Sequence, residues 1–496
     1  MAKFPIENYD GIALANLVKS GQVHRRELVE AVIDKIEAKN PKINAVIHKM
    51  YDSALKEADT TDLNEGVFSG VPTLLKDISQ EIAGEPITSG SKAFQGYIAK
   101  EDSEYVKRVR KTGTIIVGQT NVPELALMGI TEPSLYGPTR NPWDLNHTPG
   151  GSSGGSAAVI AAGIVPFAGA NDGGGSIRIP AAYCGLFGLK PTRGRTPVGP
   201  LYGRYWQGAS VEHILSKSVR DSAAMLDELC LPEKTSAFQA LPYNGSYLKC
   251  VENPSSKKLK IAYSIDSPIN RCVHQDCQQA VLNTVQQLEE MGHQIEEKTA
   301  PIDGMAIARS YIMLYFGEVS ASLTLQEKTI GRKVSSDVEP TTALLKALGK
   351  AYSAEEFVLS LREWDKAAIA MEHFHETYDL YITPTTALPP ATIGELEPRT
   401  MEKLLMKTVS RIGLGGILKK TGFVDEIVQK SLERTPFTQL ANLTGQPAMS
   451  LPLYLSPQGL PSGVQVMAAR GREDLLFEIA SILEKTDQWI DLSKLQ

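Results

Sequence analysis

Two glycine-rich loops separated by a short apolar run constrain this chain more than any other feature. Residues 150–156 read GGSSGGS, residues 157–170 are apolar throughout apart from glycines, and residues 171–176 read NDGGGS. Glycine lets the main chain adopt conformations closed to other residues and approach a ligand closely. Three glycines before a serine can direct several N–H donors at one point, as an oxyanion hole requires.

The run between the loops predicts a helix over residues 157–163 and a strand over residues 165–168. A helix followed by a strand returns the chain to the same edge of a sheet, so both loops are expected to face one cleft. Similar alternation along the chain predicts an α/β fold in which helices cover both faces of a sheet. The other expected helices and strands are 104–112, 114–118, 259–263, 278–291, 294–296 and 473–485.

We expect one domain over residues 1–496. Its predicted parts are an N-terminal helical layer (about 1–65), a core with the glycine loops (about 66–230) and a variable segment (about 300–435). Residues 11–60 carry apolar side chains at helical spacing. A strand is expected over residues 70–78, another from Tyr381 before a proline-rich loop, and a turn entering a strand over 442–452.

Composition excludes several classes of protein. The 496 residues carry a formal net charge of −6, which disfavours a nucleic-acid-binding surface. The apolar run at 157–170 is too short to span a bilayer. Five cysteines, an odd number without framework spacing, fit reduced thiols. We therefore expect a cytoplasmic protein without a membrane partner, a nucleic-acid partner or a metal site.

Two other motif matches fail on their context. Residues 113–120 resemble a phosphate-binding loop, but glutamine replaces the lysine and the residues between are strand formers. Residues 151–155 satisfy the G-x-S-x-G pattern of a nucleophile elbow, which needs a strand directly before it. A loop precedes it here. Taken alone, residues 150–155 also fit a flexible linker or a helix N-terminus, and residues 173–176 fit a tight turn with a capping serine.

The residues from Gly150 to Pro191 resemble the amidase signature family, and weaker matches lie at 70–77, 118–124, 136–143 and 442–452. The resemblance implies the family's fold, a single large α/β/α sandwich with a mixed twisted sheet covered by helices on both faces. It also implies a Ser–cisSer–Lys triad. Carried over, Ser176 is the nucleophile, Ser152 the bridging serine and Lys76 the base. The amides of Gly173, Gly174, Gly175 and Ser176 would form the oxyanion hole, and no cofactor is implied.

This assignment is chemically coherent. A serine hydroxyl is a weak nucleophile that needs a base beside it. Lysine can serve only when deprotonated, and burial lowers its pKa. Lys76 follows an apolar run. Ser153, the nearest competitor for the bridging role, is otherwise expected to support the loop, as are Asp172 and Arg178. Residues Ala126, Leu127 and Met128 match the segment that borders the family's substrate pocket, although core packing explains them nearly as well.

The resemblance predicts hydrolysis of a carboxamide C–N bond through a seryl acyl-enzyme. Glycine at 173, where many members have threonine or isoleucine, resembles the bacterial branch that includes the 6-aminohexanoate cyclic-dimer hydrolases. Two alternatives stay open: the glutaminase subunit of a tRNA-dependent amidotransferase, and a catalytically silent binding protein. The expected partner is a small-molecule amide, and the oligomeric state, a homodimer included, stays open.

Overall fold

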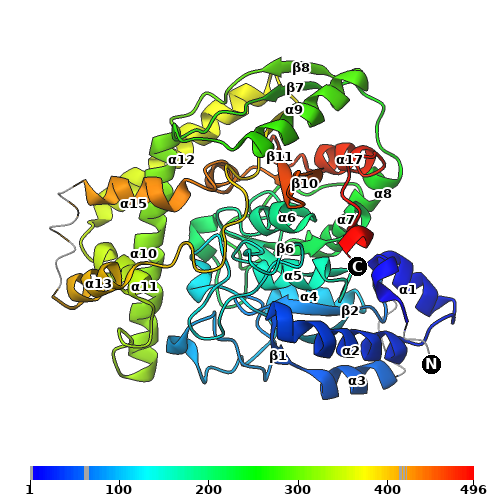
Figure 1. Ribbon diagram of the computed structural model, residues 1–496, viewed down its shortest axis with the longest axis horizontal. Helices are drawn as coiled ribbons and strands as arrows, with labels where there is room; N and C mark the ends of the chain where they lie inside the picture. Colours follow the sequence, from blue (N-terminus) through cyan, green and yellow to red (C-terminus); the bar gives the residue numbers. More distant parts are fainter. Residues whose placement is uncertain (1–3, 61–65, 413–415, 417–418, 420–421, 496) are drawn as a thin grey trace.

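A computed structural model describes residues 4–60, 66–412, 416, 419 and 422–495 (Figure 1). Its three-stranded sheet has the order β1-β3-β2. Strands β2 (Pro72–Lys76) and β3 (Ile115–Thr120) are parallel, and β1 (Val46–Lys49) pairs antiparallel with β3. β2 lies beside β4 of the second sheet, where Thr73 Oγ1 donates to the carbonyl of Phe167 at 3.0 Å. Lys76 thus ends a buried strand next to the larger sheet.

The second sheet has eight strands in the order β4-β6-β5-β10-β11-β9-β7-β8. β7 pairs parallel with β8 and β9, and the remaining pairs are antiparallel, so the sheet is mixed. Its strands are β4 (Phe167–Asp172), β5 (Phe187–Lys190), β6 (Val211–Ser216), β7 (Lys260–Tyr263), β8 (Gln294–Glu297), β9 (Leu380–Pro384), β10 (Ala448–Leu455) and β11 (Pro461–Ala468).

Helices cover both faces of this sheet. On one face α7, α8, α9 and α17 share an apolar core with Ile382 of β9, whereas Tyr381 belongs to the core of the other face, with α10, α12 and α16. The helices are α1 (Gly11–Lys19), α2 (Arg25–Ile43), α3 (Tyr51–Asp59), α4 (Glu104–Lys111), α5 (Gly154–Ala161), α6 (Arg178–Cys184), α7 (Val219–Leu229), α8 (Tyr247–Glu252), α9 (Gln275–Glu290), α10 (Gly304–Ile330), α11 (Pro340–Gly349), α12 (Ala354–His375), α13 (Thr400–Ile412), α15 (Phe423–Leu432), α16 (Gln439–Thr444) and α17 (Glu473–Leu483).

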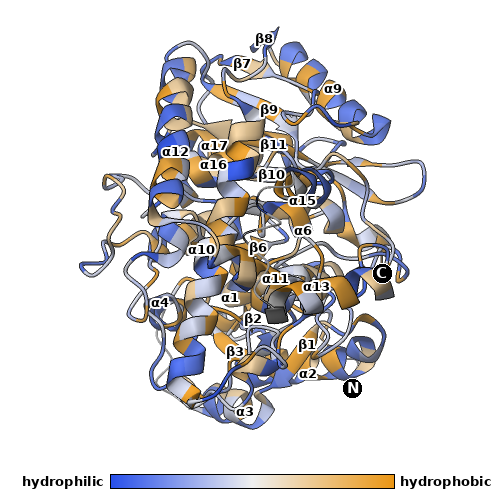
Figure 2. Cartoon of the chain, turned by 90° about the vertical axis from the view of Figure 1, so that its left-hand side faces the viewer, coloured by the Kyte–Doolittle hydropathy of each residue, from blue (hydrophilic) through white to orange (hydrophobic). Residues whose placement is uncertain are grey.

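The layers follow from the sequence pattern. Adjacent residues of a strand point to opposite faces, so fully buried strands such as β4 and β9 need apolar cover on both sides. Outer helices such as α9 and α12 carry hydrophilic residues beside hydrophobic ones (Figure 2). In Figure 1, α10, α11, α13 and α15, which belong to the segment predicted to be variable, lie together at one side of the molecule.

The predicted α/β class is confirmed, with the strands divided between two hydrogen-bonded sheets. Two local predictions are wrong. Residues 46–49 form β1 within the region 11–60 that the sequence pattern predicts to be helical, because Asn44 ends α2 in a left-handed conformation and the chain then pairs with β3. Residues 442–444 belong to α16 and not to a turn, since Asn442 is buried against the glycine loop.

Candidate active site

Lys76 and Ser152 meet in the interior. Lys76 Nζ lies 2.8 Å from Ser152 Oγ, and both residues have 0% exposed surface. Ser152 is held in the first glycine loop, where the Gly151–Ser152 peptide bond is cis. A side chain at position 151 would collide with the carbonyls of Met128 and Ile130, which explains the glycine there.

The second glycine loop lies against the first. The amide of Ser153 donates to the carbonyl of Ser176 at 3.3 Å, and Ser153 Oγ donates to the carbonyl of Asn171 at 3.3 Å. Ser176, two residues before the start of α6, is half-buried, whereas Ser152 and Ser153 are buried. The structure therefore brings the three predicted triad residues into one region, with Ser176 nearest to solvent.

Burial sets the acid–base state of Lys76. It lowers the pKa of the amine from 10.5 to about 7, although the carboxylates of Glu212 and Asp172 favour its charged form. Lys76 Nζ also donates to Asn171 Oδ1 at 2.6 Å. An amine with this pKa is available as a base near neutral pH. Sequence reasoning missed Asn171 and Glu212; the position of Asn171 directly before Asp172 was the one signal available.

Asp172 and Arg178 form a fully buried ion pair behind the glycine loop. Two guanidinium nitrogens of Arg178 donate to the Asp172 carboxylate at 2.9 and 3.0 Å, and neither side chain is exposed. Hydrogen bonds and charge from Arg178 hold the pKa of Asp172 well below its usual range despite burial. The remaining Arg178 donors bond Thr438, Asn442 and Gln465. The Asp172 carboxylate therefore stays ionised at neutral pH.

The four amides predicted for the oxyanion hole differ in their surroundings. The Gly175 amide donates to Asp172 Oδ1 at 2.6 Å and so braces the loop from within. Gly173, Gly174 and Ser176 are left as the candidate donors. A side chain at position 174 would lie 1.7 Å from the hydroxyl of Tyr311 in α10, a contact that sequence reasoning missed because no motif marks that helix.

The predicted substrate segment packs beside the first glycine loop. Leu127 is buried in the apolar core that includes α10, Ala126 is half-buried and Met128 is exposed. Leu125 and Ala126 have φ angles of 50° and 57°, a left-handed conformation that is uncommon for residues with side chains. The Met128 carbonyl lies beside Gly151 of the first glycine loop, whereas the Leu127 side chain packs in the core.

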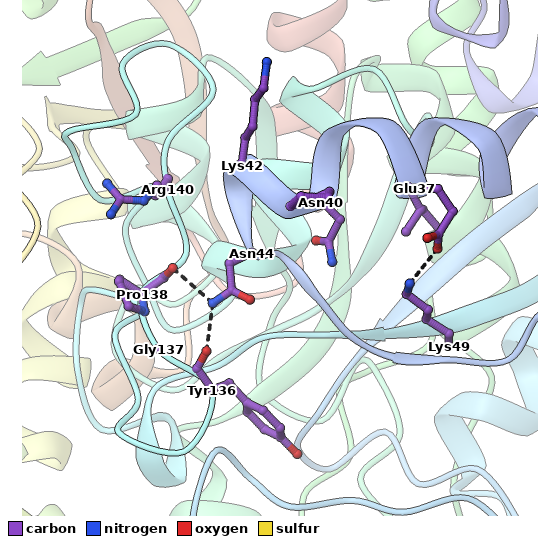
Figure 3. Close-up of a pocket in the computed structure, with 11 residues that line it drawn as sticks. Glu37, Asn40, Lys42, Asn44, Lys49, Tyr136, Gly137, Pro138 and Arg140 are labelled. Carbon is purple, nitrogen blue, oxygen red and sulfur yellow. Dashed lines mark hydrogen bonds and ion pairs between the residues drawn. The ribbon is translucent and has the colours of Figure 1, made fainter.

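A surface hollow of 410 Å³ lies elsewhere, between the end of α2 and residues 136–140 (Figure 3). Asn44 Nδ2 donates to the carbonyls of Tyr136 and Pro138. Glu37 pairs with Lys49 at 2.6 Å. Lys42 and Arg140 point in different directions. The hollow includes none of the predicted catalytic residues.

Metal-binding clusters and membrane-spanning helices are both missing from the described part of the chain. No cluster of three or more His, Cys, Asp or Glu side chains that could hold a metal occurs among the residues the structure describes. Nor does any helix within those residues have the length and apolar character needed to cross a membrane.

Comparison with known proteins now decides the family. The profile described as Amidase matches residues 27–477. This chain belongs to the amidase family. It is 36% identical over 490 residues to 6-aminohexanoate-cyclic-dimer hydrolase from Paenarthrobacter ureafaciens, covering 97% of this chain and 95% of that protein. The predicted resemblance to amidase signature enzymes and the enzyme class, a hydrolase of amide C–N bonds, are confirmed.

Solved structures agree. The structure of 6-aminohexanoate cyclic dimer hydrolase complexed with substrate superposes with a TM-score of 0.88 at 34% identity, covering 99% of this chain and 98% of that chain. A glutamyl-tRNA(Gln) amidotransferase chain from Thermotoga maritima superposes with a TM-score of 0.76 at 24% identity, covering 100% of each chain. The latter likeness shows the fold alone.

Proposed function

We propose that this amidase cleaves a carboxamide through a covalent acyl-enzyme on Ser176, with Ser152 and Lys76 transferring the proton. The observation that supports this most directly is the 2.8 Å contact between Lys76 Nζ and Ser152 Oγ inside the protein. A buried amine with a pKa of about 7 is a base that can act near neutral pH.

In the first half of the reaction, neutral Lys76 takes the proton of Ser152 as Ser152 takes that of Ser176. The freed Ser176 oxygen attacks the amide carbon, and main-chain amides of the glycine loop stabilise the oxyanion. Lys76 returns the proton through Ser152 to the leaving nitrogen, and the C–N bond breaks. Water then attacks the ester by the same proton path and releases the acid.

The buried ion pair of Asp172 and Arg178 supports this chemistry without taking part in it. Asp172 accepts from the Gly175 amide and from the amides of Ile177 and Arg178 at 3.2 and 3.4 Å. These contacts hold the loop on both sides of Ser176. Donors fixed before the reaction stabilise an oxyanion without having to reorganise in the transition state.

For the substrate we propose a small amide, and the relatives that hydrolyse the 6-aminohexanoate cyclic dimer make cyclic and linear 6-aminohexanoate amides the first compounds to assay. Glutamine belongs in the same panel, because glutaminase activity would favour the amidotransferase alternative. The present support for that alternative is a shared fold.

A fluorophosphonate probe tests the nucleophile without knowledge of the substrate. We expect the wild-type protein to gain one phosphonyl group on the peptide that contains Ser176, located by mass spectrometry. Ser176→Ala should abolish labelling and amide hydrolysis. Ser222→Ala, which alters a buried serine bonded to His213, is the matched control and should label as the wild type does. Labelling of another serine, or hydrolysis by folded Ser176→Ala, would refute the proposal.

A further inference from the structure

Besides Ser152, Lys76 contacts a second group of buried polar side chains, which includes Asn171 and Glu212. Asn171 near the end of β4 is the cross-strand partner of Glu212 in β6, so their side chains are neighbours on one face of the sheet. Asn171 is 4% exposed and Glu212 is 2% exposed. Neither residue has a role in the proton path described above.

Hydrogen bonds fix how the Asn171 amide is turned. Its oxygen accepts from Lys76 Nζ at 2.6 Å, and its nitrogen donates to Ser79 Oγ at 2.8 Å and to Glu212 Oε1 at 3.3 Å. An amide oxygen can only accept and a carboxylate can only accept. A flipped amide would therefore set two acceptors against each other at Glu212, and its NH2 group would compete with Ser152 for the lone pair of neutral Lys76.

Glu212 is itself held on both oxygens. Ser79 Oγ donates to Oε1 at 2.7 Å, and Gln80 Nε2 donates to Oε2 at 2.9 Å. Ser79 adopts a left-handed conformation, with φ at 61°, which is uncommon for a residue with a side chain and directs its hydroxyl toward the carboxylate. Gln80 Oε1 also accepts from the Lys76 amide at 2.8 Å, so the same network grips the main chain of the lysine.

We infer that Asn171 and Glu212 are positioning residues for the base: Asn171 holds one N–H of Lys76 so that the amine lone pair faces Ser152, and Glu212 locks Asn171 and stabilises the ammonium formed during attack. The inference rests on the proposed function. It follows because Asn171 Oδ1 can engage Lys76 only as an acceptor, which leaves Ser152 as the neighbour for the lone pair.

The charges around Lys76 point the same way. Burial lowers the pKa of Lys76, and Glu212 is the largest influence in the opposite direction, followed by Asp172, which Arg178 neutralises. Burial raises the pKa of Glu212, while hydrogen bonds from Ser79 and Gln80 and the charge of Lys76 favour its ionised form. Burial and the charge of Glu212 both raise the pKa values of the phenols of Tyr105 and Tyr205.

The test follows phosphonylation of Ser176 by the fluorophosphonate probe as a function of pH. Glu212→Gln removes the negative charge, so the Lys76 pKa should fall and the acid limb of the rate profile should move down by about one pH unit. Glu212→Asp keeps the charge and should stay close to the wild-type midpoint. Asp221→Asn changes another buried carboxylate, bonded to the amides of Gly11 and Ile12, and is the matched control without a shift.

Asn171→Leu, which removes the acceptor at similar volume, should slow phosphonylation at saturating probe by roughly 10²-fold with little change in the half-saturating concentration. If Glu212→Gln does not fold, Asn171→Ser carries the test, and a slowing of at least about tenfold is expected. Wild-type rates and midpoints in these variants would overturn the inference. Ser176→Ala and Lys76→Met test the triad separately. If these two variants lose activity while the variants of Asn171 and Glu212 behave as the wild type does, the inference fails and the proposed function is retained.

Discussion

Two buried polar clusters lie on opposite faces of β4 where the strand ends, and they differ in what their charges can do. The amine cluster consists of Lys76, Ser152, Asn171 and Glu212; the ion-pair cluster consists of Asp172, Arg178 and Asn442. Asn171 and Asp172 are adjacent residues, so their side chains leave the strand in opposite directions. Two consecutive residues of β4 thus belong to two clusters: one contains a lysine that titrates near neutral pH, and the other contains a carboxylate that stays ionised.

The difference shows that burial alone does not make a group reactive. Asp172 is as buried as Lys76, but the guanidinium of Arg178 beside it keeps its pKa low. Asp172 therefore takes up no proton at neutral pH. Lys76 bonds directly to the neutral groups of Ser152 and Asn171, and the Glu212 carboxylate contacts Asn171 instead of the amine. Burial is therefore the largest influence on the pKa of Lys76. Lys190 has a pKa of about 7 as well, lowered by burial and by Arg178 and Arg193. Its amine donates to the carbonyl of Pro191, and no serine hydroxyl within the described part of the chain bonds to it.

The largest expected effect separates these two lysines. Lys76→Met should lower kcat/KM for an amide, or the rate of Ser176 phosphonylation, by at least about 10⁴-fold. The reason is that removing one member of a group of residues that acts as a unit costs about as much as removing all of them. Lys190→Met, the matched control, should cost less than about tenfold since it removes one bond to a carbonyl. Equal losses in two folded variants would mean that the contact with Ser152 does not distinguish the lysines.

Substitutions in the ion-pair cluster should reduce the stability of the fold most, whereas substitutions in the amine cluster should reduce the reaction rate most. Arg178→Met leaves Asp172 buried without its partner, which should lower the free energy of unfolding by about 3–5 kcal/mol. Lys76→Met should change it far less, because a neutral amine is replaced by a side chain of similar volume. Urea unfolding followed by circular dichroism measures both. A stability loss in Lys76→Met as large as that in Arg178→Met would erase the contrast.

The glycine loop offers a paired test of geometry. At position 174 a methyl group would lie 1.7 Å from the Tyr311 hydroxyl, whereas at position 173 the nearest atom is Ser210 Cβ at an ordinary 3.5 Å. Gly174→Ala should therefore displace an oxyanion donor and lower kcat by roughly 10²–10³-fold. Gly173→Ala should stay within a few-fold of wild type. The reverse order, measured with one amide under saturating conditions, would show that the loop is not seated as described.

The smallest effect is the pH dependence of the wild type. Only neutral Lys76 can accept a proton, so kcat/KM should fall about tenfold per unit as pH drops below about 7 and level off above it. Lys190→Met should keep the same midpoint. A profile without an acid limb near neutrality, or one that Lys190→Met displaces, would assign the titration to another group.

The parts of the site that lie within one sequence segment were predictable, and the parts that depend on strand register were not. Ser152 and Ser176 stand in glycine loops whose composition demands close main-chain approach, and Lys76 follows a buried strand. Glu212 has no motif around it; its place beside Asn171 follows from the pairing of β4 with β6. Tyr311 belongs to α10 in the predicted variable segment and meets Gly174 only in the folded chain. β1 was hidden because four residues between helices carry too short a pattern.

The alternation at the end of β4 also limits how this region can change over evolutionary time. Substitution at Asn171 or Asp172 removes side-chain hydrogen bonds from one cluster and leaves those of the other in place. Insertion or deletion of a single residue within β4 would turn the two side chains to the wrong faces, sending a carboxylate toward the lysine and an amide toward the guanidinium. Among related sequences, the number of residues from Phe167 to Ser176 should therefore vary less than the residue types. Insertions and deletions should be found instead in the helical segment that follows β8.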